Sequence, residues 1–88
     1  MEEDVARTIK RFLVTELFVD IPEDEIGGDD GLQSVIGLDS IGFIELRVLC
    51  ERHFNVQITD GEFTPDNFRT VNRLTDLIGR LRAQAVES

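Results

Sequence analysis

Apolar residues recur at helical spacing in a stretch near each end of the chain. In the first stretch they fall on one face of a helix that we predict from about residue 3 to residue 18, namely Val5, Ile9, Phe12, Leu13 and Leu17. From about residue 70 onward, a second stripe is formed by Val71, Leu74, Leu77, Ile78, Leu81 and Ala85. Both patterns predict amphipathic helices that bury one face against the rest of the protein.

The central stretch, from residue 40 to residue 54, is apolar on two sides of its predicted helix. At about 100° per residue, one side collects Phe43, Leu46, Leu49, Cys50 and Phe54. The nearly opposite side collects Ile41, Ile44 and Val48, flanked by Glu45 and Glu51. A helix in so small a protein rarely buries its full circumference, so we assign the first stripe to the core. We assign the second stripe to a docking surface for partner enzymes. The alternative is that it packs, wholly or in part, against the short helix at residues 65–68.

Two shorter segments complete the predicted fold. Thr64 is a suitable helix cap and Pro65 a suitable first helical residue, so we predict a short helix that ends near Phe68. Residues 19–38 contain repeated glycines and predict a long connection. Three long helices and a short one, without a strand pattern, predict an all-α four-helix bundle with a long loop between its first two helices. Residues 1–88 are expected to form a single domain.

The formal net charge is −9, and the acidic residues dominate the first half of the chain. No Lys or Arg lies between Arg11 and Arg47. A field of this sign repels nucleic acid and attracts basic protein surfaces. We therefore expect protein partners with basic docking surfaces and no nucleic-acid partner.

The chain has no apolar run of membrane-spanning length, and acidic residues follow Met1 directly in place of a secretory signal. We expect a cytoplasmic monomer without a membrane partner. The single cysteine, Cys50, excludes an internal disulfide and lies on the predicted core stripe. The acids from Asp24 onward do not fit a calcium loop, because its third and fifth positions are Ile26 and Gly28. No metal site is predicted.

Ser40 follows a glycine-led turn and begins the central helix, with Asp39 as its predicted N-cap. Backbone N–H groups at a helix start lack intrahelical partners and the dipole there is positive, so a phosphate ester on the hydroxyl would be favoured. A catalytic role for Ser40 needs a base. The only histidine, His53, is roughly 20 Å further along the helix. Ser40 is therefore expected to be a substrate of another enzyme, not a catalyst.

The segment Gly37-Leu38-Asp39-Ser40-Ile41 resembles the G-x-D-S-L signature of acyl carrier proteins and the related peptidyl carrier proteins. Chain length, acidity, helix order and the segment from Phe54 to Ile58 agree with that family. Ile41 replaces the leucine of the signature. Gly42 stands where the family usually has a larger residue, and it either clears space beside Ser40 or is simply tolerated near the helix start.

The resemblance implies that a phosphopantetheinyl transferase moves 4′-phosphopantetheine from coenzyme A onto Ser40. Asp39 would help to position the metal-bound coenzyme A. The arm would then hold acyl groups as thioesters and present them to acyl-loading and acyl-processing enzymes. The resemblance also places partner docking on the central helix, at Ile41, Ile44, Glu45, Val48 and Glu51.

Within this family, the strong acidity favours a free-standing acyl carrier. A polyketide or other specialised-metabolite pathway is expected in preference to bulk fatty-acid biosynthesis. One alternative is a peptidyl or aminoacyl carrier of a nonribosomal-peptide-type pathway. The other is a carrier-like structural subunit that is never modified.

Overall fold

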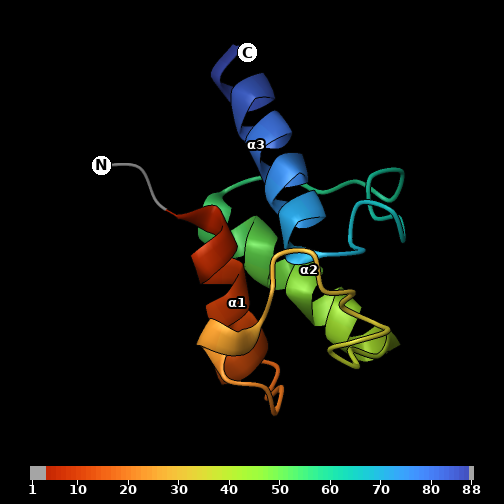
Figure 1. The fold of residues 1–88 in the computed structure, drawn as a ribbon. Coiled ribbons are helices and arrows are strands. Elements are labelled where there is room, and N and C mark those ends of the chain that lie inside the picture. The colour runs from red at the N-terminus through yellow and green to blue at the C-terminus, as the bar shows by residue number, and fades with distance from the viewer. Residues whose placement is uncertain (1–3, 88) are drawn as a thin grey trace.

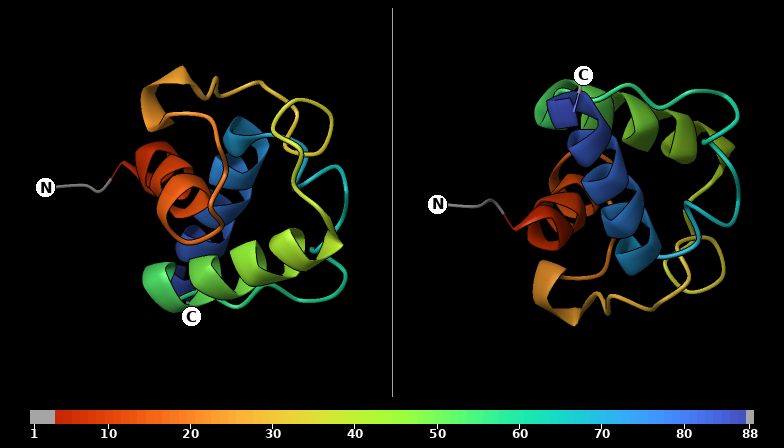
Figure 2. Two further views of the ribbon diagram at one scale, coloured as in Figure 1. Left: turned by 90° about the horizontal axis from the view of Figure 1, so that it is seen from below. Right: turned by 90° about the horizontal axis from the view of Figure 1, so that it is seen from above.

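The computed structural model describes residues 4–87, with side chains described as far as Gln84. Its elements, in chain order, are helix α1 (Val5–Thr15), the 3-10 turn η1 (Glu23–Glu25), helix α2 (Ser40–Phe54) and helix α3 (Val71–Glu87). No strand occurs within residues 4–87. Helix α1 packs against both α2 and α3, and the connections run around the outside of this group (Figures 1 and 2). The predicted all-α class is confirmed.

Helix α1 is shorter than predicted. Asp4 caps its start, because the carboxylate accepts a hydrogen bond of 3.1 Å from the backbone N–H of Arg7. The helix ends at Thr15, and Phe18 adopts a left-handed backbone conformation with φ of 56°. The backbone N–H of Val19 then donates to the carbonyl of Leu13 at 2.9 Å. The chain thus turns out of the helix three residues before the end that the apolar pattern predicts.

The short helix predicted at residues 64–68 is a single turn, so the described chain has three α-helices and not four. The predicted cap does form, since the hydroxyl of Thr64 accepts from the N–H of Asn67 at 3.1 Å. Thr70 then caps α3 by accepting from the N–H of Arg73 at 3.1 Å. These two caps lie so close together in the chain that there is room for only one turn between them. Phe68 is buried, as expected of a core anchor.

The core combines the inner faces of the helices with anchors from the long connections. Its fully or nearly fully buried members include Ile9, Leu13, Leu46, Cys50, Phe54, Phe68, Val71, Leu74 and Ile78. The connection before α2 adds the buried side chains of Ile26, Leu32 and Leu38. Hydrogen bonds join this connection to the segment before α3, where the N–H of Leu32 donates to the carbonyl of Arg69 at 2.8 Å. The long loop is therefore a packed part of the fold, and it holds the chain in place where it enters α2.

Candidate functional site

The turn before α2 places Ser40 at the surface. Gly37 has φ of +86°, a conformation that residues with a side chain rarely adopt, and it redirects the chain. Leu38 is buried and anchors the turn. Asp39 has extended backbone dihedrals, and its carboxylate accepts a hydrogen bond of 2.7 Å from the N–H of Gly42, as the predicted N-cap requires. Ser40 is the first helical residue and is exposed.

Gly42 has a steric reason to be glycine. A Cβ atom at this position would lie 2.6 Å from Cδ1 of Leu38 and 3.2 Å from a carboxylate oxygen of Asp39. Leu38 is buried, so it has little freedom to move aside. Neither explanation that the sequence left open holds, because the missing side chain makes room for Leu38 and not for a group beside Ser40. A glycine at position 42 therefore allows the buried Leu38 side chain and the capping carboxylate of Asp39 to pack against the first turn of α2.

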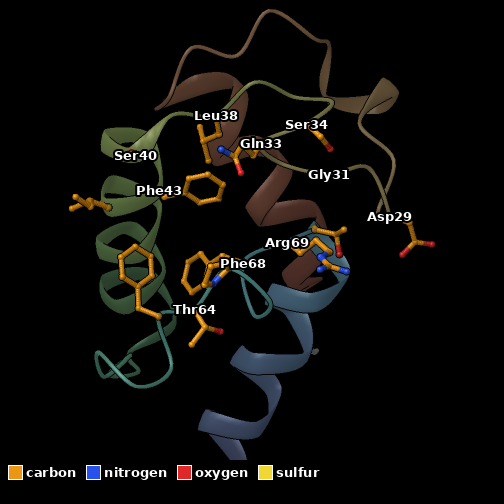
Figure 3. Close-up of a pocket in the computed structure, with 14 residues that line it drawn as sticks. Asp29, Gly31, Gln33, Ser34, Leu38, Ser40, Phe43, Thr64, Phe68 and Arg69 are labelled. Atoms are coloured by element: carbon orange, nitrogen blue, oxygen red, sulfur yellow. The ribbon is translucent and has the colours of Figure 1, made fainter.

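A groove of about 740 Å³ opens beside Ser40. Helix α2 contributes Phe43 and Ile44 to its walls, and the segment before α3 contributes Phe63 and Phe68. The rings of these last two meet edge to face with their centroids 4.9 Å apart. Figure 3 shows Phe43 and Phe68 reaching into the same space from opposite walls. Gln33, Thr64 and Arg69 are among the polar residues that also line the groove.

These residues fit a flexible phosphate-linked arm on Ser40. The serine is exposed, and it lines the groove, so a group attached there has open space beside it. The positive end of the α2 dipole lies next to the position of an attached phosphate. Asp39 satisfies the N–H of Gly42 through one carboxylate oxygen. Asp39 is itself exposed, so its carboxylate can also be reached by a modifying enzyme.

The two stripes of α2 differ in burial. Leu46, Cys50 and Phe54 of the first stripe are buried, while Phe43 and Leu49 are half-buried. The second stripe is open to solvent, with exposures of 67% for Ile41, 54% for Ile44 and 42% for Val48. Glu45 is exposed between them. The second stripe is therefore not covered by the turn around Pro65.

Glu51 has a structural use that the sequence did not reveal. Its carboxylate accepts a hydrogen bond of 2.8 Å from the N–H of Ile58 and the residue is half-buried. Arg47 strengthens the same connection by donating from Nε to the carbonyl of Ile58 at 3.1 Å. The Arg47 guanidinium also lies 4.9 Å from the centre of the Phe63 ring. Together these contacts hold the wall of the groove against α2. Phe63 was not predicted as a wall residue, and its only signal in the sequence is that it is an aromatic residue in a polar loop.

His53 is far from the chemistry of Ser40. Its ring makes edge contacts with Phe12 and Phe54, at centroid distances of 5.3 and 5.0 Å, in the last turn of α2.

Within the described residues, no group of His, Cys, Asp and Glu side chains is arranged to hold a metal ion. No helix in that part of the chain is long and apolar enough to cross a membrane.

Cys50 is fully buried, and burial, assisted by the negative charge of Glu51, raises the pKa of its thiol to about 12. At pH 8 the thiol is almost entirely protonated and cannot react as a thiolate.

We expect the folded protein without an arm to resist a thiol reagent that labels the denatured protein quickly. The number of labelled thiols, measured by mass, should rise to one when a thiol-bearing arm is attached. Rapid labelling of the folded, unmodified protein would contradict the burial of Cys50.

An exposed serine at a helix start is what a phosphopantetheine carrier requires, and comparisons with known proteins identify this class. A family model described as "Phosphopantetheine attachment site" matches residues 13–78. The D-alanyl carrier protein of Streptococcus mutans is 34% identical over 70 residues, which cover 80% of this chain and 86% of the relative. The D-alanyl carrier protein of Streptococcus sanguinis is 31% identical over the same shares of the two chains.

The chain therefore belongs to the phosphopantetheine-binding carrier protein family, as its resemblance to that family predicted. Its cofactor is covalently attached 4′-phosphopantetheine. Carriers of this family are not themselves catalysts, and a phosphopantetheinyl transferase supplies their cofactor. When attached, the group supplies a thiol on a long flexible arm.

Proposed function

We propose that Ser40 bears the arm and that the protein carries acyl groups as thioesters between enzymes. The observation that carries this proposal is the exposed hydroxyl of Ser40 at the start of α2, inside the matched region and beside an apolar groove. The chain performs no bond chemistry of its own. It holds Ser40 in a fixed position, and the helix dipole favours the attached phosphate.

The other residues of the site have separate parts in this proposal. Asp39 caps α2 and helps a transferase to position metal-bound coenzyme A next to Ser40. Ile41, Ile44 and Val48 form an exposed apolar surface for partner enzymes. Glu45 adds negative charge to this surface. Glu51 adds less, because one of its carboxylate oxygens already accepts a hydrogen bond from the N–H of Ile58. The protein is expected to work as a cytoplasmic monomer.

Two kinds of cargo are supported by different observations. The aromatic and aliphatic walls of the groove beside Ser40 suit an acyl chain, as in a specialised-metabolite or fatty-acid pathway. The similar proteins are D-alanyl carriers, which favours an aminoacyl group such as D-alanine. Incubating the modified protein with D-alanine, ATP and a D-alanine-activating ligase distinguishes the two. A D-alanyl adduct on the arm supports the aminoacyl cargo, and its absence beside a loaded streptococcal carrier counts against D-alanine as the cargo.

Intact mass tests the carrier function itself. The purified protein is incubated with coenzyme A and a phosphopantetheinyl transferase of broad specificity. We expect its mass to increase by one phosphopantetheine and to gain no second one. A mass that stays unchanged, while a control carrier is modified in the same tube, would identify the chain as a carrier-like subunit that is never modified.

Partner binding should depend on salt through the acidic residues beside Ser40. Surface charges are screened beyond about 10 Å at 0.1 M salt. We expect the association rate with the transferase to fall about threefold or more as salt rises to about 0.5 M, because electrostatic complementarity acts mainly on the association rate. Glu45→Gln should lower the rate at low salt. Asp76→Asn is the matched control, because Asp76 is an exposed residue of α3 that does not line the groove beside Ser40. Rates independent of salt would contradict this prediction.

A further inference from the structure

Phe18 is an exposed aromatic residue that the carrier site does not use. Its exposure is 81%, the largest among the exposed large hydrophobic residues of the described chain. The residue also has φ of 56°, in the left-handed region. At the end of a helix this conformation is normally taken by glycine or asparagine, because a larger side chain is strained there. Neither core packing nor local backbone geometry therefore accounts for a phenylalanine at this position.

Phe18 lines a groove of about 450 Å³ between the end of α1 and the first turn of α2. Leu17, Phe18 and Ile41 supply apolar surface, and Ile41 is also exposed. The acidic residues that line the groove are Glu16, Asp20, Asp39 and Glu45, and no Lys or Arg lines it. The groove includes Asp39, the neighbour of Ser40, so anything seated in it lies directly beside the modified serine. Ser40 lines the other groove, and Leu38 is the one residue that lines both.

The acidic lining restricts what this groove can hold. A phosphate-bearing arm, an anionic membrane and a second copy of a chain with net charge −9 would all be repelled. A basic surface would be attracted and could insert an apolar side chain between Phe18 and Ile41. The phosphopantetheinyl transferase must approach Ser40 closely, so we expect its surface to contact this groove.

We propose that the groove between Phe18 and Ile41 docks an apolar side chain from a basic surface of the phosphopantetheinyl transferase. The inference rests on the proposed attachment at Ser40 and extends the docking surface from α2 to the end of α1. Phe18 is in this view a recognition residue, retained in a strained conformation because its ring must be exposed. The acids around it guide the partner, and the ring provides the contact.

Phe18→Asn separates recognition from folding. Asparagine adopts the left-handed conformation readily, so the variant should unfold at the same temperature as the wild type or a higher one. We expect its kcat/KM for transfer from coenzyme A to fall about fivefold or more, mainly through KM, as for loss of an aromatic interface contact. Val35→Asn is the matched control, because Val35 is an exposed apolar residue that lines neither groove. It should be modified at the wild-type rate.

Three results would overturn the proposal. The first is an unchanged kcat/KM for Phe18→Asn. The second is an equal loss for Val35→Asn, which would show a general effect of apolar surface. The third is self-association of the wild type in sedimentation experiments that Phe18→Asn abolishes, which would make a second copy the occupant. Failure of the attachment at Ser40 is detected separately, because the modified residue is identified by mass in every variant.

Discussion

Ser40→Ala is expected to gain no phosphopantetheine under conditions that modify the wild type completely. Attachment needs the hydroxyl oxygen of Ser40 as the nucleophile that accepts the group from coenzyme A, and alanine lacks it. The substitution should not disturb folding, because the side chain is exposed and alanine is favourable in a helix. Intact mass measures the modification, and circular dichroism confirms that the helices persist.

Ser34→Ala is the matched control for this experiment. Ser34 is also exposed and lines the same groove as Ser40, but it lies in a turn of the long connection and not at a helix start. It should accept the wild-type amount of phosphopantetheine. If Ser40→Ala were still modified while Ser34→Ala were not, the attachment site would lie on the connection, and the role assigned to the start of α2 would be wrong.

Leu46→Ala should destabilise the protein by about 2–5 kcal/mol, the usual cost of truncating a buried leucine. Leu46 is completely buried among the core residues of all three helices. Val48 is nearby on the exposed side of α2, with 42% of its surface accessible, so Val48→Ala should cost much less. Urea unfolding of both variants, followed by circular dichroism, measures the two free energies.

Val48→Ala should instead slow transfer to or from a partner enzyme, because it removes apolar surface from the predicted docking stripe. The transfer rate is compared at equal concentrations of folded protein. If Val48→Ala were as destabilising as Leu46→Ala and transferred its cargo at the wild-type rate, the second stripe would belong to the core. The docking assignment of Ile41, Ile44 and Val48 would then be lost.

The start of α2 could be predicted from the sequence because its causes are local. The glycine turn, the Asp39 cap and the helical residues after it are contiguous in the chain, and the structure places α2 at Ser40–Phe54 as predicted. The same is true of the cap at Thr64, whose partner Asn67 is three residues away. Such interactions depend on neighbours in sequence, and a pattern of residue types is enough to identify them.

Features that depend on distant contacts could not be predicted in this way. The wall of the groove is held by Arg47 and Glu51 through Ile58, and no local pattern pairs these residues. The left-handed conformation of Phe18 could not be predicted either, because the apolar spacing continues through Leu17 and predicts that the helix extends to residue 18. Gly42 could be explained only when the position of Leu38 was known. The choice between a buried and an exposed second stripe likewise needed the fold.

Localising the arm on the wild-type protein tests the central claim most directly. No Lys or Arg lies between Arg11 and Arg47, so trypsin leaves Ser34 and Ser40 in one peptide. Fragmentation of that peptide between these two residues assigns the added mass in a mass spectrometer. The account predicts that fragments containing Ser40 carry the phosphopantetheine and that those ending before Asp39 do not. Added mass on fragments that contain Ser34 but lack Ser40 would contradict it.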